Sequence, residues 1–236
     1  MLNPFAFNLS ERSRFVAAQA RIIEWGSRVL DVGAGKGRYR SLFSHCDYKT
    51  QDFGKEPGTI GEYTELDYES DITSIPVDDG SFDVILCTEV LEHVPEPIIA
   101  VKELARIIKP GGLLILTAPL GSFLHQEPYH YYGGYTPHWY RKFLPEAGFS
   151  VISIEANRGF FSWFGQESQR FSILLDPRKT MGSGWSWPLL TLLWLITFPF
   201  CWFLFPMVGR VLDRLGFERM ATVGYHVVGR KENATS

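Results

Sequence analysis

The sequence predicts an α/β fold in which a mostly parallel sheet is covered by helices on both faces. Two observations carry this prediction. Residues 28–32, 82–87 and 113–117 are short, predominantly apolar runs without polar alternation, which is typical of strands buried on both faces. Between the last two runs, residues 97–108 place apolar side chains at helical spacing. Strands and helices therefore alternate along the chain.

Start and stop signals predict the remaining elements. Ser10 is expected to cap a helix that ends at Gly26, because serine satisfies free amides at a helix start and glycine ends helices. Thr136 before Pro137 predicts another helix start, and that helix should end near Gly148. The other expected features are a helix over 38–43, a helix stop at 109–112, and strands over 48–52, 150–154 and 221–230.

The composition restricts the partners and the compartment. A chain of 236 residues with a net charge of −3 and a pI of about 6.1 lacks the basic surface that nucleic acids require, so no nucleic acid partner is expected. The three scattered cysteines have no metal-ligand spacing, which predicts a reducing compartment and no zinc site. Residues 1–7 carry no secretory signal features, so we expect a cytoplasmic catalytic domain.

A glycine-rich loop follows the first strand of the sheet. Gly33, Gly35 and Gly37 are spaced as G-x-G-x-G, whereas the nicotinamide and flavin fingerprint is G-x-G-x-x-G. Glycines at such a turn let the backbone approach a ligand closely. Asp31 directly precedes them, and its alternative role is to cap the backbone amides of the turn. The loop therefore predicts a nucleoside-type ligand other than a dinucleotide.

Two later carboxylates complete a nucleoside site. Asp52 lies where the second strand ends, a position at which a carboxylate accepts hydrogen bonds from a ribose diol. Asp71 and Ile72 offer a carboxylate for an adenine amino group and an apolar face for the ring. The alternatives are that Asp52 is a solvated strand end and that Asp71 caps a turn.

These motifs resemble those of class I S-adenosylmethionine-dependent methyltransferases. The segments that carry the resemblance are residues 29–37, 71–72, 82–85, 89–94 and 104–112. The resemblance extends from residue 28 to residue 154 and resumes at the end of the chain. It implies a seven-stranded Rossmann-like sheet in which the final strand is antiparallel and lies beside the strand that ends near Pro119.

The resemblance also implies S-adenosylmethionine as the cofactor and a set of residues that bind it. By the resemblance, the methionine part would be bound by the first loop, through Asp31, Gly33, Ala34, Gly35 and Gly37. The ribose would be bound by Asp52, and the adenine by Asp71 with Ile72. The amine or sulfonium would face Thr88 and Glu89, at the end of the strand at 82–87. Glu92 and His93 are interpreted as a structural pair at a helix start.

The acceptor is expected to bind at the segment from Leu120 to Tyr135, which follows a strand end and is rich in tyrosine and histidine. A base is needed only if the acceptor must lose a proton. His130 is the first candidate because imidazole titrates near neutrality, and His125 is the second. The alternative is a loop that packs over the cofactor with solvated histidines. A metal site from His125, Glu127, His130 and His138 is not expected, because their spacing matches no known ligand pattern.

A long apolar stretch separates this domain from the last strand. From Trp185 to Val208 the chain carries no charge, and as one helix it would exceed the ~30 Å of a bilayer core. The strand at 221–230 must nevertheless rejoin the sheet, and Pro199 should kink or break a helix. We therefore predict a re-entrant or interfacial helical hairpin on the membrane surface. The alternative is a buried cap or a dimer interface.

Together these features predict four segments and one function. The segments are a methyltransferase domain over 1–156, a hydrophobic insertion over 157–218, the final strand over 219–231 and a disordered tail over 232–236. The predicted function is methyl transfer from S-adenosylmethionine to a small-molecule or lipid-linked acceptor of a glycan or isoprenoid-lipid pathway, on the inner face of the membrane. The alternatives are a nicotinamide-dependent oxidoreductase and a non-catalytic cofactor-binding or membrane scaffold protein.

Overall fold

The computed structural model describes residues 7–54, 65–179, 187–215 and 221–233. The chain divides into two compact units. The larger unit comprises residues 11–155 and 224–236, and the smaller unit comprises residues 1–10 and 156–223. The predicted tail over 232–236 lies mostly outside the described residues, as do Trp185 and part of the loop that follows Asp52.

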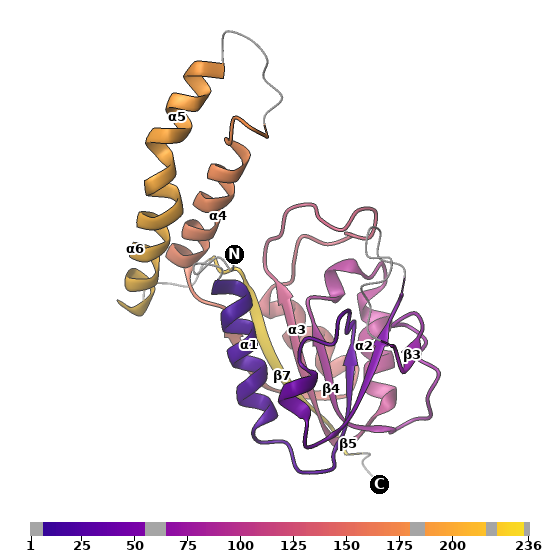
Figure 1. The fold of residues 1–236 in the computed structure, drawn as a ribbon. Helices are drawn as coiled ribbons and strands as arrows, with labels where there is room; N and C mark the ends of the chain where they lie inside the picture. Colours follow the sequence, from indigo (N-terminus) through magenta and orange to yellow (C-terminus); the bar gives the residue numbers. More distant parts are fainter. Residues whose placement is uncertain (1–6, 55–64, 180–186, 216–220, 234–236) are drawn as a thin grey trace. The chain divides into compact units, whose positions relative to one another are not determined.

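Seven strands form one mixed sheet, whose order is β3-β2-β1-β4-β5-β7-β6 (Figure 1). In chain order they are Arg28–Val32 (β1), Asp47–Asp52 (β2), Tyr68–Glu69 (β3), Phe82–Thr88 (β4), Ile108–Pro119 (β5), Phe149–Ala156 (β6) and Gly224–Lys231 (β7). β3, β2, β1, β4 and β5 pair in parallel, and β7 pairs antiparallel with β5. The predicted fold class, including the antiparallel final strand beside the strand that ends at Pro119, is confirmed.

Helices lie on both sides of this sheet (Figure 1). They are α1 (Phe7–Ala20), the short 3₁₀ turns η1 (Arg40–Phe43) and η2 (Leu91–His93), α2 (Pro97–Ile107) and α3 (Pro137–Glu146). Val16 and Ala20 of α1 pack with Val29 and Val84 of the sheet in one buried cluster. Thr136 caps α3 by accepting a hydrogen bond from the Trp139 amide, as predicted. These contacts fix α1 against β1 and β4.

Several element boundaries differ from the predictions. Ser10 does not cap α1, because it lies inside the helix and its hydroxyl donates to the Phe7 carbonyl. α1 also ends at Ala20 rather than near Gly26, because tight turns such as the bond from the Ile23 amide to the Ala20 carbonyl bring Ile23 into the core. The predicted helix over 38–43 is only the 3₁₀ turn η1, and the predicted helix stop at 109–112 lies within β5.

The smaller unit contains a helical hairpin. Its arms are α4 (Phe160–Leu174) and one long helix, which is divided into α5 (Trp187–Pro199), a π segment η3 (Phe200–Leu204), α6 (Phe205–Leu212) and a final 3₁₀ turn η4 (Asp213–Leu215). The arms run antiparallel, because the Ser168 hydroxyl donates to the Cys201 carbonyl at 2.9 Å while the Trp194 indole donates to the Ser172 carbonyl at 3.0 Å.

Glycines allow the two arms to approach closely. A Cβ on Gly165 would lie 2.8 Å from Cα of Pro206, and a Cβ on Gly209 would lie 2.3 Å from the Phe161 carbonyl oxygen. The small and polar face of α4 is therefore buried against the long helix. Large apolar side chains on both arms remain exposed, among them Phe164, Phe171, Leu189, Leu192, Leu195, Ile196, Phe203 and Met207.

The hairpin differs from the prediction in where the chain turns back. Residues 187–208 do not fold back on themselves, since they belong to a single helix of 29 residues from Trp187 to Leu215. Pro199 does not break this helix, because the five-residue π segment that follows it absorbs the irregular backbone geometry. The other arm is α4, which precedes the long helix within the predicted insertion over 157–218.

Asp213 connects the two ends of the hairpin. Its carboxylate accepts hydrogen bonds from the amides of Gly159, Phe161 and Ser162, at 3.0, 3.2 and 3.1 Å. These are the free amides at the start of α4, where a negative charge also stabilises the helix dipole. We expect Asp213→Ala to reduce the stability of the hairpin by about 1–3 kcal/mol.

Hydrogen exchange checks this prediction: the amides of α4 should exchange faster in Asp213→Ala, and those of β4 should be unchanged. The neighbouring exposed residue gives the matched control, Arg214→Ala. Equal protection of α4 in the two variants would contradict the capping role.

Candidate active site

A cavity of about 300 Å³ opens at the carboxyl ends of β1, β2 and β4. Ligands of open α/β sheets bind at this edge. Its walls include the glycines Gly33 and Gly35 of the first loop and the carboxylates of Asp52, Asp71 and Glu89. They also include the apolar side chains of Phe53, Ile72 and Val90, and Gln126, Tyr129 and Tyr131 from the loop after β5.

The glycine loop has the conformation that its sequence indicated. Gly33 has φ +68°, and a Cβ there would lie 2.3 Å from the Val90 side chain. Gly35 has φ +51°, and no atom lies within 4 Å of the position its Cβ would take. Its amide donates to Asp52 Oδ2 at 2.8 Å. The loop thus presents bare backbone to the cavity and is fixed to the end of β2.

Two of the predicted carboxylates lie on the cavity wall with fixed orientations. Asp52 accepts hydrogen bonds from the amides of Gly35 and Gly54, the latter at 3.2 Å. Asp71 uses Oδ1 to accept from the amide and hydroxyl of Thr73, at 2.8 and 2.7 Å. Asp71 therefore does cap a turn, as its alternative interpretation stated. It also lines the cavity together with Ile72, so the two roles coexist.

Other predicted residues support the cavity without lining it. Asp31, Ala34, Gly37 and Thr88 are not among the described lining residues. The Ala34 amide donates to the Gln51 carbonyl at 3.0 Å, and the Gly37 amide closes a turn on the Ala34 carbonyl at 2.8 Å. Their assignment to the methionine part of the cofactor stays a prediction.

Asp31 is buried beneath the loop, where its carboxylate accepts a short hydrogen bond from the Tyr48 hydroxyl. Burial raises the pKa of Asp31 from 3.8 to about 7. The folded protein therefore keeps a proton between about pH 4 and pH 7 that the unfolded chain has lost, and its stability falls as the pH rises through that window. Full ionisation above pH 7 costs about 4 kcal/mol.

This linkage gives a prediction for Asp31→Asn, which cannot ionise but can still accept the Tyr48 bond. Relative to the wild type, the variant should gain stability between about pH 4 and pH 8, by up to about 4 kcal/mol. Urea denaturation of both proteins at pH 4 and pH 8 measures the difference in their free energies of unfolding. A difference that does not change with pH would show that folding does not raise the pKa of Asp31.

Glu89 lies at the end of β4 in a left-handed conformation, φ 55°, which is uncommon for residues other than glycine and often marks a functional position. Its carboxylate accepts a hydrogen bond from the Thr117 hydroxyl at 2.8 Å and forms an ion pair with Arg12 at 3.2 Å. The side chain also lines the cavity. The Glu89 carboxylate is thus held in a fixed position on the cavity wall that Gly33 and Gly35 also line.

Three histidines gather at one side of the cavity. The rings of His125 and His130, the predicted candidate bases, lie 4.6 Å apart between centroids. His93 lies 4.8 Å from His125 and 5.8 Å from His130, and it lines the cavity. Burial lowers the pKa of both His93 and His130. His93 was not among the predicted site residues, although it lies in the segment 89–94 that carries the family resemblance.

Comparison with known proteins decides the family. The sequence model of the methyltransferase domain family matches residues 6–166. The chain belongs to this family. A protein of Mycobacterium sp. (strain KMS), named an uncharacterized methyltransferase, is 30% identical in an alignment of 189 residues that covers 67% of this chain and 75% of that protein. The ubiquinone biosynthesis O-methyltransferase of Aliivibrio fischeri (strain MJ11) is 34% identical in an alignment of 98 residues that covers 37% of this chain and 42% of that protein.

Solved structures show that the methyltransferase has the expected fold. A SAM-dependent methyltransferase from Archaeoglobus fulgidus has a TM-score of 0.55 and 16% identity, covering 93% of this chain and 94% of that one. The 1,6-didemethyltoxoflavin-N1-methyltransferase from Burkholderia thailandensis, solved with S-adenosylhomocysteine, has a TM-score of 0.52 and 14% identity, covering 98% of this chain and 80% of that one.

The methyltransferase depends on S-adenosylmethionine, and its cavity fits this cofactor. The described lining residues include three carboxylates and no lysine or arginine. Such a wall favours a ligand with a cationic sulfonium and ammonium, and it disfavours the pyrophosphate of a nicotinamide dinucleotide. Ile72, Val90 and Phe53 supply the apolar surface that an adenine ring requires.

Proposed function

We propose that the enzyme methylates a hydroxyl group of a lipid-linked acceptor that is presented at the surface of a membrane. The observation that carries the proposal is the exposed apolar surface of the hairpin. The helix Trp187–Leu215 has a window of 18 residues with mean hydropathy 1.9, of which 6% is buried. Soluble proteins rarely expose apolar patches of this kind, and such patches mark membrane or protein contacts.

The membrane is favoured over a protein partner by the distribution of the apolar side chains. They project from both arms and surround the long helix, whereas the polar contacts of α4 are turned inward against that helix. Lipid can cover an apolar surface on several sides, while one protein interface covers a single face. Arg178 and Lys179 precede the long helix, and Arg210 and Arg214 lie near its other end. Basic residues at both ends of one continuous helix suit a hairpin that lies along the headgroup layer.

The proposed roles of the cavity residues follow from their positions. Asp52 binds the ribose diol, Asp71 with Ile72 binds adenine, and Glu89 faces the sulfonium or amine of the methionine part. His130 and His125 lie at the acceptor side of the cavity. The Aliivibrio fischeri relative is named for O-methylation in ubiquinone biosynthesis, which supports a hydroxyl acceptor of the isoprenoid-lipid class.

Fractionation tests the membrane part of the proposal. Cells that express the intact chain are lysed without detergent, and the soluble and membrane fractions are separated. The proposal expects the protein in the membrane fraction, from which detergent releases it, and in vesicle pellets after purification. Recovery of the folded protein in the soluble fraction, without binding to vesicles, would contradict it.

A further inference from the structure

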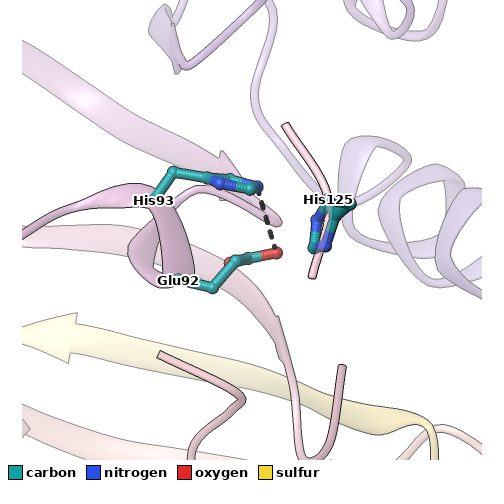
Figure 2. A group of neighbouring side chains, drawn as sticks. All are labelled: Glu92, His93 and His125. Atoms are coloured by element: carbon teal, nitrogen blue, oxygen red, sulfur yellow. Dashed lines mark ion pairs between the residues drawn. The ribbon is translucent and has the colours of Figure 1, made fainter. Parts of the chain in front are cut away.

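A carboxylate and two imidazoles point toward one another beside the cofactor cavity (Figure 2). Glu92 and His93 come from η2, and His125 comes from the loop after β5. One potential ligand atom from each residue lies within 4.8 Å of the others. His93 also forms part of the cavity wall, so this group of three residues, the Glu92 cluster, lies directly against the site of methyl transfer.

Both imidazoles are oriented by backbone carbonyls. His93 Nδ1 lies 2.6 Å from the Tyr129 carbonyl oxygen, and His125 Nδ1 lies 2.8 Å from the Phe123 carbonyl oxygen. Since a carbonyl only accepts, Nδ1 carries the proton in each neutral ring and Nε2 keeps its lone pair. Histidine ligands of metal ions are oriented in this way, through a hydrogen bond from the second ring nitrogen.

Glu92 has an incomplete set of partners. The residue is 1% exposed, and its Oε2 atom is buried without a hydrogen-bond partner among the described residues. On the cluster side, Nε2 of His93 lies 3.9 Å from Oε1, which is too far for a hydrogen bond. Leaving a buried carboxylate oxygen without a partner is costly, whereas coordination of a cation compensates its charge.

We propose that Glu92, His93 and His125 bind one divalent transition-metal ion of the zinc type and leave a coordination position open toward the cavity. Two histidines and one carboxylate form a known ligand set of catalytic zinc sites. Donor atoms around a tetrahedral zinc ion lie about 3.3 Å apart, because each bond is about 2 Å long. Small rotations of the His93 side chain and of the exposed His125 side chain would close the present separations.

The proposed role of the ion rests on the proposed function. A hydroxyl oxygen of the acceptor at the open position becomes more acidic, as water does on zinc. Its proton passes to His130 or to water. The oxygen then forms a bond to the methyl carbon while the carbon–sulfur bond breaks, and the electron pair of that bond stays on sulfur. The products are the methyl ether and S-adenosylhomocysteine.

Metal binding is tested on the full chain in detergent, with Co²⁺ and Zn²⁺ and without cofactor or acceptor. Calorimetry with Zn²⁺ gives the stoichiometry, and the visible spectrum of Co²⁺ reports histidine coordination. We compare the wild type with His125→Ala and Glu92→Gln. The matched control is His138→Ala, because His138 is an exposed histidine on α3 outside the cluster.

We expect one ion per chain in the wild type and in His138→Ala, and at least about 10-fold weaker binding in His125→Ala and Glu92→Gln. Absence of stoichiometric binding by the wild type, or equal binding by His125→Ala and His138→Ala, would overturn the proposal. His125→Ala removes an exposed side chain, so its result does not depend on core packing. Binding of S-adenosylmethionine is measured in parallel, and its failure would concern the proposed function and not the metal site.

Discussion

Replacing Asp52 by alanine is expected to weaken the binding of S-adenosylmethionine by at least about 100-fold. Hydrogen bonds to a charged acceptor contribute about 1.5–3 kcal/mol each, and two such bonds from the ribose diol correspond to a factor of 100 or more. The variant also loses the bonds that Asp52 accepts from the amides of Gly35 and Gly54, so the glycine loop becomes less ordered. Titration calorimetry measures the loss.

Two further variants make this test specific. Asp52→Asn keeps one oxygen acceptor and should lie between the wild type and Asp52→Ala. Asp78→Ala removes an exposed carboxylate outside the cavity and should bind the cofactor like the wild type. An unchanged affinity in Asp52→Ala would show that the ribose is bound elsewhere.

Two charges on the long helix are expected to release the protein from membranes. Leu192 and Ile196 are 55% and 56% exposed and lie one helical turn apart on α5. Burying a leucine or isoleucine side chain contributes about 1.5–3 kcal/mol, and a charged glutamate adds a desolvation cost. We therefore expect Leu192→Glu/Ile196→Glu to reduce partition into lipid vesicles by at least about 100-fold. Sedimentation with vesicles measures the partition.

Exposed apolar residues outside the hairpin provide the matched control. Ile22 and Trp25 are 68% and 86% exposed and belong to the larger unit, so Ile22→Glu/Trp25→Glu should partition like the wild type. Both variants should keep their affinity for S-adenosylmethionine, which shows that they are folded. Equal partition of the two double variants would mean that the hairpin is not the membrane anchor.

Local patterns predicted most of the sheet because β1, β4 and the middle of β5 are short apolar runs with clear ends. The glycine loop and Asp52 were also predictable, since a strand, a turn and a strand end fix their relative positions. Helix ends were less predictable. Gly26 is a turn glycine beyond α1, and only the tertiary packing of Ile23 shows that the helix has already ended at Ala20.

The parts of the site that depend on distant contacts could not be predicted from the sequence. His93 and His125 are separated by a helix and a strand, and only the fold brings their rings 4.8 Å apart. The local spacing of His125, Glu127, His130 and His138 matched no ligand pattern, so the sequence predicted no metal site, and Glu92 with His93 was interpreted as a structural pair. In the same way, α4 was recognisable as the second arm of the hairpin only through its contacts with η3 and α6.

The central claim is that the methyl group is transferred to a lipid-linked acceptor. The most direct test incubates the purified enzyme in vesicles with methyl-labelled S-adenosylmethionine and either a total lipid extract or the aqueous metabolite extract of cells that express the protein. We expect label in the organic phase of the lipid reaction, and we expect that label to disappear in Asp52→Ala. Label confined to the aqueous extract, or none in either reaction, would contradict the claim.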